Sequence, residues 1–145
     1  HESLAINLYL AKKFGGPLAP KDAREDGEMT MWALWAATGL EPHSLNVLYH
    51  SIGKPPAERD PKILAAAIEG CRAPLAVLDK ALANTGYLVG GRFTVADINV
   101  AEIVRYAQPA KELFEANPNV KRWIEACQAR KAFKDMMAKR DAEPA

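Results

Sequence analysis

The chain has few cysteines, no long apolar run and almost no net charge, and each shortage argues against a class of protein. Two cysteines in 145 residues are too few for a disulfide scaffold, so we expect a reducing compartment and a cytoplasmic protein. No apolar stretch approaches the ~20 residues that a transmembrane helix needs, so we expect no membrane partner. With 19 basic and 18 acidic side chains and a net charge of +1, a dedicated nucleic-acid binder is also disfavoured.

The chain is instead rich in helical patterning. Its 145 residues, 49% of them hydrophobic, are enough for one domain with its own core. Every long segment repeats its apolar residues at helical spacing, and none shows sustained strand alternation. The pattern predicts an all-α bundle with helices over 2–14, 22–39, 43–52, from 60 to a turn at 84–86, over 95–104, from 109, from 117, and a short last helix containing Phe133, Met136 and Met137.

Three helix starts carry capping residues. Asp22 precedes Glu25 by three positions, which is an acidic variant of the capping box, and Asp60-Pro61 places proline at the first helical position behind a capping side chain. Thr94 and Asp97 have the same spacing, so Thr94 is expected to cap its helix while Asp97 bonds back to the Thr94 amide. This reciprocal structural role accounts for both residues, and we exclude them from the active site.

The distribution of apolar residues predicts which helices lie in the core. Residues 95–104 carry three polar side chains and should form the central helix, while 29–39 is apolar nearly all round and should be covered on two sides. Cys71 and Cys127 lie on apolar stripes and are expected to be buried thiols. Prolines at 42 and 74 should interrupt or kink their helices. The stripe of the last long helix should continue into the final one, through Val120, Trp123, Ile124, Cys127, Phe133, Met136 and Met137.

Five motifs follow one another along the chain. They are Glu2-Ser3-Leu4-Ala5-Ile6 with Tyr9-Leu10, the stretch 16–25, Trp32-Ala33-Leu34-Trp35 with Gly39-Leu40-Glu41-Pro42, the run Tyr87 to Ile98, and Asn117-Pro118 with Trp123, Arg130 and Ala132-Phe133. In this order they resemble the C-terminal, all-helical domain of a cytosolic bacterial glutathione S-transferase, although Lys131 stands where that family often has proline. The resemblance implies that 1–15 is the last helix of a thioredoxin-like domain otherwise missing from the chain, 16–21 a linker and 22–145 the helical domain.

The same resemblance implies that Glu2 and Ser3 bind glutathione. The γ-glutamyl end of glutathione carries an ammonium, which a carboxylate can pair with, and a carboxylate, which a serine hydroxyl and helix N-terminal amides can hold. The alternative from the residues alone is a plain helix start, with Ser3 as the cap and Glu2 solvated. No residue of the chain is assigned a catalytic role, because in this family the group that stabilises the glutathione thiolate lies in the thioredoxin-like domain.

A pocket for the hydrophobic electrophile is implied at Leu34, Thr38, Glu41 and Tyr106. The first three share one face of the second helix, whereas Tyr106 has the equally open alternative of packing in the core with its hydroxyl at the surface. The two tryptophans of that helix, Trp32 and Trp35, are assigned to the core or to a subunit interface.

Neither a metal nor a nucleic acid is expected as a partner. His1, His43 and His50 have no ligand spacing with cysteine or paired acidic residues. Residues 121–140 hold seven basic and two acidic side chains, which would suit RNA. Basic residues also favour helix C-termini, however, and no exposed aromatics are interleaved for stacking.

Two functions follow from the resemblance. In the first, the whole protein is a homodimeric enzyme that joins glutathione, its substrate, to small hydrophobic electrophiles. In the second, the chain is a non-catalytic interaction module of the kind found in translation-factor or synthetase assemblies. The presence of Glu2 and Ser3 favours the enzyme, because an assembly module needs no γ-glutamyl site.

Overall fold

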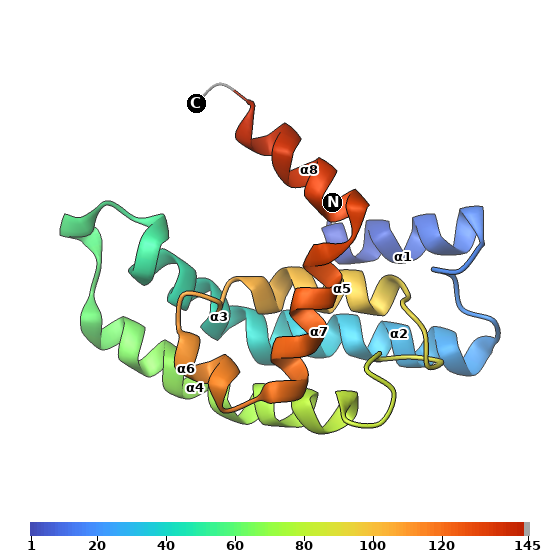
Figure 1. Cartoon of the computed structure of the whole chain (residues 1–145), viewed down its shortest axis with the longest axis horizontal. Coiled ribbons are helices and arrows are strands. Elements are labelled where there is room, and N and C mark those ends of the chain that lie inside the picture. Colours follow the sequence, from blue (N-terminus) through green and yellow to red (C-terminus); the bar gives the residue numbers. More distant parts are fainter. Residues whose placement is uncertain (144–145) are drawn as a thin grey trace.

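A computed structural model describes residues 1–143, and all regular elements in that range are helical. They pack as a bundle with α4 along one edge and α8 projecting from the opposite side (Figure 1). The prediction of an all-α domain is confirmed. The elements are α1 (Ser3–Phe14), α2 (Ala23–Trp35), η1 (Ala36–Leu40), α3 (Glu41–Leu48), η2 (Tyr49–Gly53), η3 (Pro56–Glu58), α4 (Pro61–Leu82), α5 (Val95–Arg105), α6 (Lys111–Glu115), α7 (Pro118–Ala129) and α8 (Lys131–Asp141).

Pro42 interrupts the regular helix without ending the helical path. Between α2 and α3 the chain forms the π-helical segment η1, in which the Glu41 amide donates to the Ala36 carbonyl five residues back. Pro42 then lies in the first turn of α3, where it supplies no N–H to the continuing helical path. The predicted interruption is therefore confirmed as a local widening of the helix.

Helix α5 forms the centre of the bundle, as predicted. It packs against α1, α2, α3 and α7, and seven of its 11 residues are buried. Asp97 and Asn99 are both completely buried in it. Buried polar groups of this kind are stable only when they are hydrogen-bonded. The elements that pack on α5 must therefore supply hydrogen-bond partners for Asp97 and Asn99.

The capping box at the start of α5 is present. The Thr94 amide donates to Asp97 Oδ2 at 2.8 Å, and Thr94 Oγ1 accepts from the Ala96 amide at 3.3 Å. The other carboxylate oxygen, Asp97 Oδ1, accepts from the Leu88 amide at 3.2 Å and from Trp123 Nε1 at 2.9 Å. Burial raises the pKa of the Asp97 carboxyl, although these donors favour its charged form. Asp97 therefore joins α5 to α7 and to the preceding connector.

The capping box predicted at the start of α2 is only half formed. Asp22 Oδ1 accepts from the Glu25 amide at 2.8 Å, as expected. The Glu25 carboxylate does not return to Asp22 but accepts from the Lys21 amide at 2.8 Å and from both Arg92 terminal nitrogens at 2.8 and 2.7 Å. The reciprocal bond to Asp22 was wrongly predicted, because the Glu25 carboxylate reaches one residue further back, to the Lys21 amide, where it also forms the two-point ion pair with Arg92.

Helix α4 begins where the sequence predicts and supplies a cap to another helix. Asp60 Oδ1 accepts from the Lys62 and Ile63 amides at 2.8 and 3.4 Å. Further along, Asp79 Oδ1 accepts from the amides of Asn119 and Val120 at 2.7 and 3.1 Å, at the start of α7. The helix continues past the proline at 74. Its predicted apolar seam faces the core, with the last four of these residues almost fully buried: Leu64, Ile68, Cys71, Leu75, Leu78 and Leu82.

The final helix does not continue the buried stripe of α7. The α7 stripe is buried as predicted, but no residue of α8 is buried, and Met136 is 45% exposed. At Arg130 the backbone leaves the helical conformation with ψ at 139°, which turns α8 away from the bundle (Figure 1). The prediction that Phe133, Met136 and Met137 extend the stripe is therefore wrong.

Residues 1–143 cover the second helix on one side only. Met29, Trp32 and Ala33 of α2 are buried, whereas Met31 is 47% and Leu34 61% exposed. The ring of Trp32 packs edge-on against that of its neighbour at 35, with centroids 5.1 Å apart. The apolar composition of α2 predicted that it would be covered on two sides, and residues 1–143 cover one of them.

Candidate functional site

The N-terminal end of α1 carries Glu2 and Ser3, and both are exposed. Glu2 is the N-cap, with φ 62° and ψ 93°, and is the one non-glycine residue with positive φ in residues 1–143. A backbone in this region is strained by ~1–3 kcal/mol and persists mainly at functional sites. The Glu2 side chain makes no capping hydrogen bond. Ser3 lies inside the first turn, so the alternative in which Ser3 caps the helix is wrong.

The backbone at this helix end adds donors to the two side chains. The first hydrogen bond of α1 runs from the Ile6 amide to the Glu2 carbonyl at 3.0 Å, so the amides of Ser3, Leu4 and Ala5 precede the helical ladder. Helix N-terminal amides attract anions. A carboxylate, a hydroxyl and these amides together are complementary to an α-amino acid group, which carries one positive and one negative charge.

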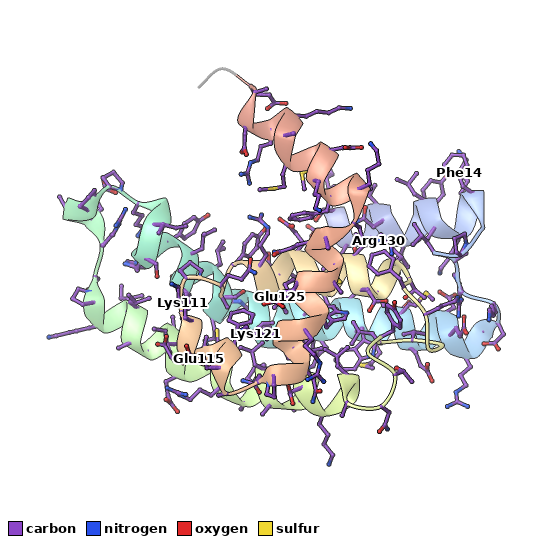
Figure 2. The ribbon with its side chains drawn as sticks, in the orientation of Figure 1. Phe14, Lys111, Glu115, Lys121, Glu125 and Arg130 are labelled. Carbon is purple, nitrogen blue, oxygen red and sulfur yellow. The ribbon has the colours of Figure 1, made fainter. Side chains whose placement is uncertain are left out.

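A groove of about 490 Å³ opens beside this helix end, between α1, α5 and the turn from α7 to α8. Ser3 lies at its edge, and its floor is apolar, with contributions from Ile98, Ile124 and Phe133. At the α7–α8 turn, the Arg130 guanidinium lies 3.8 Å from the centroid of the Phe93 ring (Figure 2). The groove therefore combines an apolar surface with a cationic rim next to the predicted ligand-binding pair.

The four residues predicted to line an electrophile pocket lie outside this groove. Leu34 is exposed on α2, and Thr38 Oγ1 donates to its carbonyl at 2.8 Å. Glu41 and Tyr106 are half-buried, and they belong to neighbouring elements, since Glu41 begins α3, Tyr106 directly follows α5, and α3 packs against α5. Burial raises the pKa of the Tyr106 hydroxyl. None of the four residues lines the groove, and their common pocket stays a prediction.

Two residues of α5 that were not predicted as site residues lie at the groove. Asn99 and Glu102 both line the groove with Ser3. Glu102 forms an ion pair with Arg105, whose Nε donates to it at 3.0 Å, and the Arg105 guanidinium lies 5.3 Å from the Tyr106 ring centroid. Through Arg105, Glu102 thus links the groove to Tyr106. The sequence did carry a sign of Asn99 and Glu102, because they are among the few polar residues of the most apolar helix.

Both cysteines are buried thiols, as predicted. Cys71 is completely buried and Cys127 is 7% exposed. Burial raises the pKa of Cys71 to about 11, and burial together with the nearby Asp97 carboxylate raises that of Cys127 to about 12. Thiols with such high pKa values are poor nucleophiles at neutral pH.

The described residues offer neither a cluster of metal ligands nor a membrane-spanning helix. Residues 1–143 contain no group of three or more His, Cys, Asp or Glu side chains placed to hold a metal ion. None of the helices in that range combines the length and apolar character needed to cross a bilayer.

Comparison with known proteins identifies related sequences. Residues 40–131 match the family model described as the glutathione S-transferase C-terminal domain. Over 137 residues the chain is 29% identical to the glutathione S-transferase GstB of Escherichia coli, a match that covers 94% of this chain and 66% of that protein. The chain thus spans just under two thirds of the length of this relative.

Solved structures show the same arrangement of helices. The glutathione transferase URE2P5 of Phanerochaete chrysosporium superposes with a TM-score of 0.84 at 25% identity, over 96% of this chain and 65% of that one. A glutathione transferase of Burkholderia graminis, determined with two glutathione molecules bound per subunit, superposes with a TM-score of 0.81 at 28% identity, over 93% of this chain and 58% of that one.

Proposed function

The chain belongs to the glutathione S-transferase C-terminal domain family, and from that premise we propose that the whole protein joins the thiolate of glutathione to small hydrophobic electrophiles. In this proposal the helical domain supplies part of the electrophile pocket and of a subunit contact. The related proteins named above are glutathione transferases, which supports the enzyme over the alternative of an assembly module.

The observation that carries the proposal is the strained end of α1. Glu2 holds positive φ although it is not glycine, and its exposed carboxylate stands beside the Ser3 hydroxyl and the free amides of the first turn. We assign the ammonium of the γ-glutamyl group to Glu2, and the carboxylate of that group to Ser3 and the amides. These contacts would hold the end of glutathione remote from its sulfur.

The chemistry at the sulfur needs a further group. The thiolate of glutathione is the nucleophile, and its pKa must be lowered for it to be abundant at neutral pH. We place the group that lowers it in a thioredoxin-like domain, of which residues 1–15 form the last helix, with 16–21 as linker and 22–145 as the helical domain. The exposed apolar side chains of α1 support this division, because they offer a surface for such a domain: Ile6, Tyr9, Leu10 and Phe14, the last at the far end of α1 in Figure 2.

The electrophile pocket is proposed at Leu34, Thr38, Glu41 and Tyr106. The link from Glu102 through Arg105 to Tyr106 supports it, because it connects this region to the groove beside the proposed glutathione end. The exposed side of α2 supports a homodimer, since an apolar face left uncovered by its own domain suits an isologous contact. We expect the enzyme to act in the cytoplasm.

The test is a glutathione titration of the chain followed by NMR at the amides of Ser3, Leu4 and Ala5. We expect these amides to shift with a dissociation constant no tighter than about 1 mM, or ~−4 kcal/mol, because a few polar contacts barely offset the cost of ordering a flexible ligand. Cysteinylglycine, which lacks the γ-glutamyl group, is the control and should leave them unshifted. Equal shifts with both ligands, or none with glutathione, would contradict the proposal.

A further inference from the structure

Two asparagines join the N-terminal half of α1 to the central helix. Asn99 Oδ1 accepts from Asn7 Nδ2 at 2.8 Å, and Asn99 Nδ2 donates to the carbonyl of Leu4 at 3.2 Å. The partners are 92 and 95 residues apart in the chain. The side-chain oxygen and nitrogen of Asn99 are therefore both hydrogen-bonded to the first two turns of α1.

Asn99 is completely buried, and this makes the contact selective. A buried amide group left without partners costs ~1–3 kcal/mol, so the arrangement that satisfies both of its ends is strongly favoured. A rotation or a one-residue slide of α1 would move the Leu4 carbonyl and the Asn7 amide away from Asn99. Apolar contacts are non-directional and tolerate such shifts, whereas these two hydrogen bonds do not.

Leu4 and Leu8 of α1 pack against the hydrophobic core through non-directional apolar contacts. The other anchors of α1 lie at its opposite end. Ala11 is its single buried residue, and the Lys12 ammonium lies 2.7 Å from Asp26 Oδ1. Just after the helix, the Leu18 carbonyl accepts from the Val95 amide at 3.1 Å. Within residues 1–143, the side-chain hydrogen bonds that tie residues 1–8 to another element are the two made by Asn99.

We infer that Asn99 is the positioning residue for glutathione: through Asn7 and the Leu4 carbonyl it fixes the register of α1 and so places Glu2 and Ser3. The inference rests on the function proposed above. Binding groups must be held to about 0.5 Å to be effective, and Asn99 meets that need from the buried central helix α5. Asn99 does not itself touch the ligand in this account.

Amide hydrogen exchange of the chain tests whether the hydrogen bonds of Asn99 stabilise the N-terminal half of α1. We expect Asn99→Ala to speed exchange at the amides of Ile6, Asn7 and Leu8 by about tenfold, the factor that corresponds to losing roughly one hydrogen bond of local stability. Asn117→Ala is the matched control. Asn117 is also a buried asparagine, with Nδ2 donating to the Leu113 carbonyl at 2.7 Å, but it lies far from α1. Exchange in α1 should be unchanged in that variant.

A second variant guards against loss of the fold. Asn7→Ala lies at a half-buried position and removes the 2.8 Å bond while leaving the bond from Asn99 to Leu4, so it should speed the same amides by a smaller factor. Unchanged α1 exchange in both variants, or equal acceleration in Asn117→Ala, would overturn the inference.

A glutathione titration of the same variants separates this inference from the proposed function. We expect the dissociation constant read at the Ser3 amide to weaken about tenfold in Asn99→Ala and to stay unchanged in Asn117→Ala. Equal glutathione affinity in wild type and Asn99→Ala would overturn the positioning role while leaving the glutathione site intact. A wild-type chain that never responds to glutathione would instead overturn the proposed function, and exchange would still decide whether Asn99 holds α1.

Discussion

Glycine is favoured at position 70 by the packing of the His43 ring of α3 against α4. A Cβ atom built there would lie 2.3 Å from Nδ1 of the His43 ring and 2.7 Å from two of its carbons. The backbone of Gly70 is ordinary helix, so neither a turn nor a cap requires the glycine. Its role is to let an imidazole of the facing helix lie against the backbone, which is a tertiary requirement.

Gly70→Ala should therefore lower the free energy of unfolding by about 1–3 kcal/mol through overpacking, in spite of the better helix propensity of alanine. Gly27→Ala is the control, because Gly27 lies inside α2 with no atom near its absent Cβ, and it should stabilise by up to about 1 kcal/mol. Urea denaturation midpoints measure both. Restoration of the midpoint by adding His43→Ala would identify the clash, whereas stabilisation by Gly70→Ala alone would disprove it.

The ion pair between Glu25 and Arg92 links α2 to the connector before α5. Arg92 also donates to the Ala19 carbonyl at 2.8 Å. The hydrogen bonds from Arg92 and then from the Lys21 amide lower the pKa of the Glu25 carboxyl from 4.5 to about 2. A carboxyl whose folded pKa is depressed stabilises the protein above its unfolded pKa and loses that contribution as the pH falls.

The stability difference between wild type and Glu25→Gln should thus be full above pH 4.5 and shrink as the pH falls toward about 2. Unfolding by urea at a series of pH values measures it. Glu28→Gln, which removes an exposed pair with Arg24, is the control and should change stability at neutral pH by ~0–1 kcal/mol. A difference for Glu25→Gln that stays constant from pH 6 to pH 2 would be incompatible with the ion pair.

At the scale of elements, the start of α5 is the most heavily bonded helix end of the domain. The motif alone predicts losses of about 0.5–2 kcal/mol for alanine at either Thr94 or Asp97. The structure predicts different losses of stability for the two substitutions, because Asp97 also accepts hydrogen bonds from the Leu88 amide and from the indole of Trp123. Removal of Asp97 strands these buried donors in addition to the cap.

We expect Thr94→Ala to cost about 1–2 kcal/mol and Asp97→Ala more than about 3 kcal/mol, since each stranded buried donor adds ~1–3 kcal/mol. Chemical denaturation of the two variants provides the comparison. Asp22→Ala, a cap at an exposed helix start, serves as the reference for a simple capping loss. Equal losses for Thr94→Ala and Asp97→Ala would mean that the bonds to α7 and the connector contribute nothing.

Helix starts and core faces were predictable because their signals are local. Asp60-Pro61 and the Thr94 box act within a few residues, and the seam of α4 repeats at helical spacing. The cap that Asp79 supplies to α7 crosses 40 residues, and nothing near Asn119 announces it. The course of α8 depends on one backbone turn at Arg130, and its apolar residues resemble those of a buried helix.

The candidate site divides in the same way. Glu2 and Ser3 form one contiguous motif and were found by resemblance to a family. The strained backbone of Glu2, the groove and the hold of Asn99 on α1 arise when α1 packs on α5, between segments more than 90 residues apart. The sequence marks Asn99 as a polar residue inside an apolar helix. Its hydrogen-bond partners on α1 could not be predicted, because they depend on how the two helices pack.

For the molecule as a whole, the uncovered side of α2 predicts association. We expect the chain to dimerise weakly and Met31→Lys, at a position 47% exposed on α2, to abolish this by placing a charge in an apolar contact. Ile52→Lys is the control, at a position 63% exposed on η2, and should leave association unchanged. Sedimentation at increasing concentration measures it, and a strictly monomeric wild-type chain would exclude α2 as a subunit contact.

We claim that the end of α1 binds the γ-glutamyl group of glutathione, and steady-state kinetics of Ser3→Ala in the whole enzyme provide a sharp test. The claim predicts a KM for glutathione raised roughly 10-fold or more, the loss of a hydrogen bond to a charged group, with kcat changed less than about threefold because Ser3 lies remote from the sulfur. Ser51→Ala, on η2 and away from α1, should behave as wild type. An unchanged KM for glutathione in Ser3→Ala would contradict the claim.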